Sequence, residues 1–132
     1  MDNSTLVLSG VKILVIDDEP EVRDIIKRIL TLYYASVMAA ANAAAALEQM
    51  KTLRPDVILS DIDMPRMDGY QFIREVRNLP AYKGGQTPAV ALTAFSRRED
   101  RTNAINAGFQ KYLSKPVDFE ELIDTIASVV GQ

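Results

Sequence analysis

The sequence predicts a doubly wound α/β domain, in which five parallel strands form one sheet with helices on both faces. Strand-like and helix-like segments alternate five times along the chain, which is typical of right-handed βαβ crossovers. The strand candidates are short and mostly apolar, as expected for strands that are buried on both faces. Four of them end in a polar residue that a buried core does not need. This pattern indicates a site along one edge of the sheet.

The first half of the chain contains three predicted strands and two predicted helices. The strands cover residues 11–16, 36–40 and 56–60, and the helices cover residues 20–32 and 43–53. The second of these helices is rich in alanine, which has the highest helix propensity. The first helix is predicted from an apolar stripe with a period of 3.6 residues, formed by Val22, Ile25, Ile26, Ile29 and Leu30.

Two loops and a third helix form the middle of the chain. Residues 62–68 contain proline and end in an Asp-Gly pair, which is typical of a loop. Asp68 followed by Gln71 predicts the start of a helix, which extends to about residue 79. A second loop, over residues 80–88, contains two prolines and the Gly84-Gly85 pair.

The last part of the chain completes the alternation. Strands are predicted over residues 88–92 and 110–114. The helix between them opens at the capping-box pattern of residues 96–99 and ends near Gly108. The final helix begins at Asp118, and its predicted apolar face consists of Phe119, Leu122, Ile123, Ile126 and Val130.

The composition indicates one globular domain and excludes several kinds of chemistry. The 132 residues carry a net charge of −3, which argues against a nucleic-acid-binding surface. The chain has no cysteine for a disulfide or a thiolate site, and no histidine, so any phosphohistidine must come from a partner or from a segment outside this sequence. No apolar stretch reaches membrane-spanning length and no signal peptide is evident, so we expect no membrane contact and a cytoplasmic location.

The polar residues at the strand ends suit a divalent cation and a phosphoryl group. They are Asp17 and Asp18 after the first strand, Asp61 after the third, Thr93 after the fourth and Lys115 after the fifth. Magnesium prefers oxygen ligands and commonly uses one or two carboxylates. A carboxylate can attack phosphorus, and an ammonium and a hydroxyl can stabilise the phosphoryl oxygens.

Each of these residues also has a local explanation. Asp18 suits the N-cap of the first helix. Asp61 could be a turn former, Thr93 a β-branched strand residue and Lys115 a solvated surface lysine. A cap does not explain two adjacent aspartates after a buried strand, because their mutual repulsion needs a cation or a lysine to offset it. We therefore expect Asp18 to serve both as a cap and as a ligand.

Taken together, these residues resemble the receiver domain of two-component response regulators. The resemblance rests on Asp17-Asp18, the segment from Leu59 to Gly69, Thr93-Ala94, Ala107-Gly108 and the segment from Tyr112 to Pro116, in the order and spacing of the family. It covers about residues 11–130, so we expect an N-terminal extension over 1–10 and the receiver domain over 11–132. It implies a flavodoxin-like (βα)5 fold with strand order 2-1-3-4-5.

The resemblance also implies a role for each site residue. Asp61 would accept a phosphoryl group from a phosphohistidine on a sensor histidine kinase or a histidine phosphotransfer protein. Mg²⁺, or alternatively Mn²⁺, would be held by Asp18, Asp61 and the backbone carbonyl of Asp63, with Asp17 acting largely through water. Lys115 would pair with Asp61 and then with the phosphoryl oxygens.

A conformational switch is implied as well. The hydroxyl of Thr93 would turn to the phosphoryl group, and Tyr112 would swing inward to follow it. The fourth helix, fifth strand and fifth helix would form the surface that a partner reads. Members of this family commonly pair through that surface when phosphorylated, so a phosphorylation-dependent homodimer is compatible with the sequence. The bond between Lys115 and Pro116 would be cis.

Two other functions compete with this interpretation. A haloacid-dehalogenase-like phosphatase also uses an Asp-x-Asp motif such as Asp61-Ile62-Asp63, but its acidic pair follows its lysine, whereas Asp17-Asp18 comes first. A receiver-like interaction module that takes no phosphate is opposed by the presence of all the expected site residues.

The residues before the first strand and the Gly84-Gly85 loop resemble receivers of hybrid sensor kinases. A receiver phosphorylates and dephosphorylates itself and is no conventional turnover enzyme.

Overall fold

A five-stranded parallel sheet forms the centre of the molecule, in a computed structural model that describes residues 6–94 and 98–131. The strand order is β2-β1-β3-β4-β5, as predicted. The strands are β1 (Lys12–Ile16), β2 (Ser36–Ala40), β3 (Val57–Asp61), β4 (Ala89–Thr93) and β5 (Lys111–Ser114). The helices are α1 (Pro20–Leu32), α2 (Ala43–Thr52), α3 (Gly69–Arg77), α4 (Arg98–Ala107), α5 (Phe119–Val130) and the short 3₁₀ segment η2 (Ala81–Lys83).

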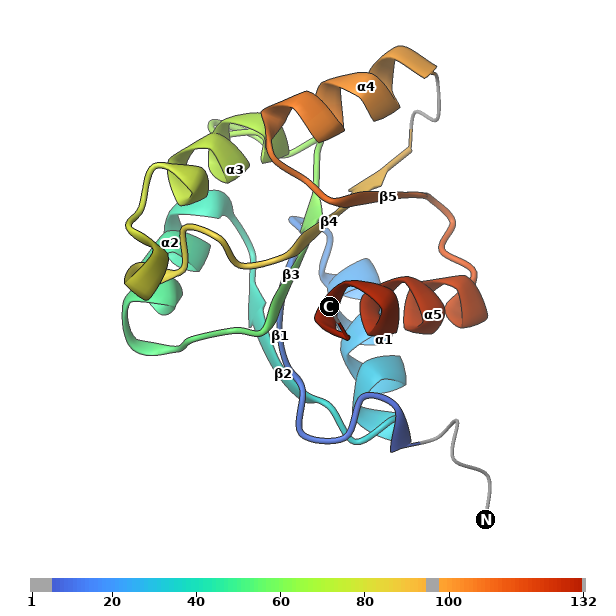
Figure 1. The fold of residues 1–132 in the computed structure, drawn as a ribbon. Coiled ribbons are helices and arrows are strands. Elements are labelled where there is room, and N and C mark those ends of the chain that lie inside the picture. The colour runs from blue at the N-terminus through green and yellow to red at the C-terminus, as the bar shows by residue number, and fades with distance from the viewer. Residues whose placement is uncertain (1–5, 95–97, 132) are drawn as a thin grey trace.

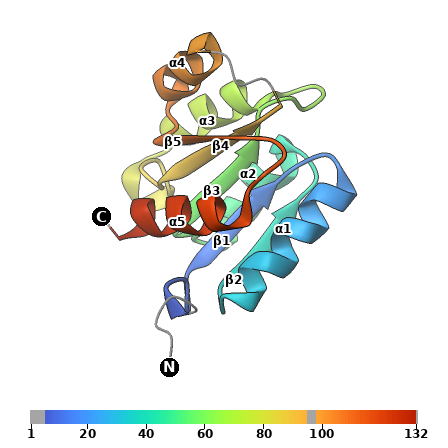
Figure 2. The ribbon, with the colours of Figure 1, turned by 90° about the vertical axis from the view of Figure 1, so that its right-hand side faces the viewer.

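Helices cover both faces of this sheet. Figures 1 and 2 show α1 and α5 on one face and α2, α3 and α4 on the other. Successive strand residues point to opposite faces, so β1 contributes Ile13 and Val15 to the α1–α5 core and Leu14 and Ile16 to the α2–α3–α4 core. This double burial explains why the strands are continuous apolar runs without polar alternation.

Local signals set most element boundaries. The predicted capping box at α3 is confirmed, because the Asp68 carboxylate accepts from the Gln71 backbone N–H and the Gln71 side chain accepts from the Asp68 N–H. The loop over 80–88 contains η2. The first part of the capping-box pattern predicted before α4, with Ser96, lies outside the described residues.

The prediction that Asp18 caps the first helix is wrong. The N-cap of α1 is Glu19, and no side chain makes a capping hydrogen bond there. The helix itself begins at Pro20, as predicted, so the residue in the N-cap position is Glu19 and not Asp18. The backbone N–H of Glu19 donates instead to Asp17 Oδ1 at 2.9 Å.

The predicted helix faces are correct in part. Phe119 occupies the first position of α5 and is 46% exposed, while Val129 completes the buried stripe in place of Val130. Ile25, in the predicted stripe of α1, is similarly about half exposed. Before β1, Leu8 is fully buried and joins the α1–α5 core. None of the described helices is both long enough and apolar enough to cross a bilayer.

Candidate functional site

The predicted polar residues meet at the carboxyl edge of the sheet. Asp17 follows β1 directly, Asp61 ends β3, Thr93 ends β4 and Lys115 follows β5. The backbone continues the sheet at this edge, because the N–H of Lys115 donates to the carbonyl of Thr93 at 2.8 Å. Parallel pairing therefore brings together residues that lie up to 98 positions apart in the sequence.

Lys115 links the two buried carboxylates. Its Nζ lies 2.9 Å from Asp17 Oδ2 and 3.3 Å from Asp61 Oδ1. The Lys115 side chain is only 14% exposed, so water screens these two contacts weakly. A third carboxylate, that of Glu19, lies 3.6 Å from the same nitrogen but is mostly exposed. One ammonium group thus offsets part of the repulsion between Asp17 and Asp61.

Burial makes Asp61 unusually difficult to ionise. The residue is 2% exposed. Desolvation and the neighbouring charge of Asp17 raise the pKa of Asp61 to about 6, although the ammonium of Lys115 acts in the opposite direction. Burial by itself would lower the pKa of Lys115, but its contacts with Asp17 and Asp61 outweigh burial and raise it. The site therefore carries an excess of negative charge that one lysine does not neutralise.

The oxygens of Asp61 have different surroundings. Oδ1 accepts from the backbone N–H of Asp63 at 3.3 Å and faces Lys115. The contacts of this carboxylate with Lys115 and with Asp63 thus both involve Oδ1.

The donor set fits a hard divalent cation. Carboxylate oxygens of Asp17, Asp18 and Glu19 lie within 4.8 Å of one another. Asp17 is buried and fixed by Lys115, whereas Asp18 and Glu19 are exposed. Oxygen ligands of this kind, with room for water on the exposed side, are what Mg²⁺ prefers. Among the described residues this group does not include the predicted ligands Asp61 and Asp63, and Asp63 is exposed.

Two further predicted residues lie on the side of the site towards α4. Thr93 is 2% exposed at the end of β4. Tyr112, on β5, is partly buried and packs against the α2–α3–α4 core. The Arg101 guanidinium lies 5.7 Å from the centre of the Tyr112 ring, and burial raises the pKa of the Tyr112 hydroxyl. The bond between Lys115 and Pro116 is cis, as expected.

Three residues of the site were not predicted to have these contacts. Glu19 joins the acidic group, and its signal was only its position beside Asp17-Asp18. The Arg23 Nη1 donates to the carbonyl of Asp17 at 2.7 Å, which fixes the loop after β1. A Cβ on Gly69 would lie 2.5 Å from the carbonyl oxygen of Asp61, so only glycine allows α3 to start this close to β3.

Comparisons with known proteins agree with this geometry. The family model described as response regulator receiver domain matches residues 13–127. A protein of Leptolyngbya boryana, described as an uncharacterized 14.6 kDa protein in the sodA1 3′ region, is 47% identical over 116 residues, which are 88% of this chain and 87% of that protein. Response regulator MprA of Mycobacterium bovis is 36% identical over 86% of this chain, which spans only 48% of MprA.

Solved structures share the fold. Chemotaxis protein CheY4 of Vibrio cholerae superposes with a TM-score of 0.85 at 30% identity, covering 92% of this chain and 99% of CheY4. The receiver domain of the sensor histidine kinase PA1611 from Pseudomonas aeruginosa PAO1, with a magnesium ion coordinated in its active site cleft, gives a TM-score of 0.85 at 32% identity over 94% of this chain and all of that domain. This chain therefore belongs to the response regulator receiver domain family and is a phosphoacceptor signalling domain of the two-component type.

Proposed function

We propose that Asp61 is the residue that accepts the phosphoryl group and that Mg²⁺ is required for the transfer. The observation that carries this proposal is the position of Lys115, whose Nζ contacts Asp17 and Asp61 at 2.9 and 3.3 Å. These contacts gather the ends of β1, β3 and β5 around a buried carboxylate. The contacts of Asp61 with Lys115 and with the Asp63 N–H both involve Oδ1, so we assign the attack to Oδ2.

The transfer proceeds by attack of Asp61 Oδ2 on the phosphorus of a phosphohistidine. A phosphorus–oxygen bond forms, the phosphorus–nitrogen bond breaks, and the partner's histidine leaves with its electron pair. Asp18, Asp61 and the carbonyl of Asp63 would hold Mg²⁺ or Mn²⁺, and Asp17 would act through water. Bound there, the cation neutralises charge on the phosphoryl oxygens.

Lys115 exchanges one partner for another during this step. Its ammonium is shared between Asp17 and Asp61 before transfer and contacts a phosphoryl oxygen afterwards, while Asp17 keeps it in place. The hydroxyl of Thr93 donates to another phosphoryl oxygen. Phosphorylation adds about −1.5 to −2 of charge at this position, which is enough to move nearby side chains.

Tyr112 carries the change to the surface formed by α4, β5 and α5. It is partly buried against the α2–α3–α4 core, and its ring centre lies 5.7 Å from the Arg101 guanidinium of α4. Movement of the Tyr112 ring towards Thr93 would change the shape of the α4–β5–α5 surface and so change whether a partner can dock there. The proposal includes a phosphorylation-dependent homodimer that forms through the same face. It also includes a domain boundary at residue 11.

The phosphoryl donor in this proposal is a sensor histidine kinase or a histidine phosphotransfer protein. Its histidine is needed because this chain contains none. A cytoplasmic location would give the domain access to kinases that are charged by ATP. A phosphatase of the haloacid dehalogenase type is not favoured, because the family match covers residues 13–127 and the acidic pair precedes the lysine in the sequence.

A beryllofluoride titration tests the assignment of Asp61. Beryllofluoride mimics a phosphoryl group on an aspartate, so its binding should require Mg²⁺ and should be lost in Asp61→Asn. Asp124→Asn, which removes an exposed carboxylate on α5, serves as the matched control and should bind as the wild type does. Binding without Mg²⁺, or equal binding by Asp61→Asn, would contradict the proposal.

A further inference from the structure

A groove between α2 and α3 lies away from the carboxyl edge that carries the acidic site. It has a volume of about 670 Å³ and is lined by Ala44, Leu47, Met50 and Leu79, with charged residues on its rim. A volume of this size falls in the range of about 300–1,000 Å³ that is typical of small-molecule sites. Its lining residues come from α2, α3, the segments that follow these helices, and the end of η2, so it is separate from the α4–β5–α5 surface.

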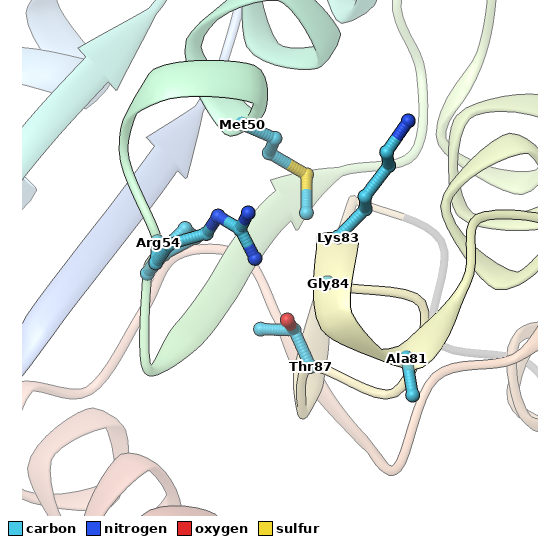
Figure 3. Close-up of a pocket in the computed structure, with 7 residues that line it drawn as sticks. Met50, Arg54, Ala81, Lys83, Gly84 and Thr87 are labelled. Atoms are coloured by element: carbon cyan, nitrogen blue, oxygen red, sulfur yellow. The ribbon is translucent and has the colours of Figure 1, made fainter.

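The groove continues into a smaller cavity at the end of α2. This cavity has a volume of about 170 Å³ and shares Met50, Arg54 and Lys83 with the groove. Its remaining lining residues are Pro55, Ala81, Gly84 and Thr87. Figure 3 shows the Arg54 guanidinium, the Met50 thioether and the Thr87 hydroxyl directed towards one another, while the Lys83 side chain extends away from Arg54 and Thr87.

The charges of the small cavity are one-sided. Its lining contains two cations, Arg54 and Lys83, and no carboxylate. Neither cation forms an ion pair with a described residue, although Lys83 Nζ lies 5.7 Å from the centre of the Tyr82 ring. In the larger groove, by contrast, Glu48 is paired with Lys51 at 2.8 Å, and the lining also includes the carboxylate of Glu75. The small cavity therefore carries only positive charge, whereas the groove carries charges of both signs around its apolar residues.

Backbone geometry keeps the small cavity open. Gly84 has a φ of +101°, and a Cβ at this position would lie 2.9 Å from Met50 Cε and 3.3 Å from Thr87 Oγ1. The neighbouring segment is held by Arg77, whose Nη1 donates to the carbonyls of Gly85 and Thr87 at 3.1 and 2.7 Å. The cavity thus has one wall held by Arg77, and the buried Met50 methyl lies close to Gly84.

We propose that this groove binds a small amphiphilic anion, with its carboxylate or phosphate beside Arg54 and Lys83 and its apolar body along Leu47, Met50 and Leu79. The two cations and the Thr87 hydroxyl match the anionic group, and the apolar floor matches the body. This site is separate from Asp61 and does not depend on phosphorylation. The proposal therefore stands or fails independently of the function proposed above.

A pair of fluorescent probes tests this proposal on the whole chain. Anilinonaphthalene sulfonate carries an aromatic body and an anionic group, and N-phenylnaphthylamine has a similar body without the charge. The sulfonate should bind more tightly than the neutral probe. Arg54→Gln and Lys83→Gln should each weaken sulfonate binding by about two- to fivefold, and together by about tenfold. Arg28→Gln, an exposed arginine of α1 on the opposite face of the sheet, is the matched control.

Methyl NMR of the methionines locates the bound probe. The Met50 methyl resonance should shift on titration, while that of Met64, which is packed near the acidic site, should not. Ala44→Trp should block binding without a change of charge, and its unchanged far-ultraviolet circular dichroism would show that the variant folds. Equal binding by Arg54→Gln and Arg28→Gln, equal affinity for both probes, or a stationary Met50 methyl would overturn the proposal. If the protein bound phosphatidylglycerol vesicles but not the sulfonate probe in solution, the proposal would be overturned as well.

Discussion

Replacing Asp61 by asparagine should stabilise the metal-free protein at neutral pH. The carboxylate is 2% exposed and its pKa is raised to about 6 by burial and by Asp17, so the folded state resists its ionisation. Asparagine has nearly the same shape, cannot ionise, and still offers Lys115 and the Asp63 N–H an oxygen. A functional residue that destabilises its own fold is expected where chemistry requires a buried charge.

The size of the effect follows from the shift of the pKa. Its ordinary value is 3.8 and its folded value is about 6, a difference of about 2 units at 1.36 kcal/mol per unit. The pKa of Asp61 is higher in the folded state than in the unfolded state. The stability of the wild type is therefore greatest below pH 3.8, and stability is lost as the pH rises from there to about 6. The penalty in the wild type should therefore reach about 3 kcal/mol at neutral pH and nearly vanish at about pH 4.

Urea denaturation in the presence of a chelator measures this difference. Asp61→Asn should be more stable than the wild type at neutral pH by about 1–3 kcal/mol, and the two proteins should converge as the pH falls to about 4. Asp124→Asn, on the exposed surface of α5, should follow the wild type at every pH. A variant that is equally or less stable than the wild type at neutral pH would refute the proposed burial of a destabilising charge.

Other predictions concern the cation, the loop after β3 and the buried arginine. Mg²⁺ should raise the urea midpoint of the wild type, because it binds only the folded state. This gain should be lost in Asp18→Asn, and an equal gain in the variant would exclude Asp18 as a ligand. Gly69→Ala should cost about 1–3 kcal/mol in a denaturation experiment, since its Cβ would lie 2.5 Å from the Asp61 carbonyl oxygen, and an unchanged midpoint would show that the loop relaxes freely. Arg77→Met should lower the free energy of unfolding by about 2–4 kcal/mol, because it leaves the carbonyls of Gly85, Thr87 and Gly108 without their donor; a loss below about 1 kcal/mol would mean that water replaces the guanidinium.

Much of the fold could be predicted because its signals are local. Apolar runs of strand length, the capping box at Asp68 and the alternation of elements depend on nearby residues, and these predictions agree with the structure to within a few positions. The meeting of Asp17, Asp61, Thr93 and Lys115 at one edge follows from parallel pairing alone. Strand order and the cis bond before Pro116 came instead from resemblance to a family.

The remaining features depend on packing that a sequence does not show. Lys115 Nζ lies 2.9 Å from Asp17 Oδ2 and 3.3 Å from Asp61 Oδ1, and the sequence alone does not reveal which carboxylate lies closer. The close approach of Gly69 to β3 depends on the path of a loop with no regular period. The cap of α1 was misassigned because Asp18 has a good capping side chain, whereas the residue directly before the helix is Glu19, which makes no side-chain cap.

Intact-protein mass spectrometry after incubation with acetyl phosphate and Mg²⁺ tests the central claim most directly. The wild type and Asp124→Asn should gain the mass of one phosphoryl group, and chelation of Mg²⁺ should prevent this gain. Asp61→Asn should gain nothing. Phosphorylation of Asp61→Asn to the level of the wild type, or of the wild type without Mg²⁺, would contradict the assignment of Asp61 as the acceptor at a magnesium-dependent site.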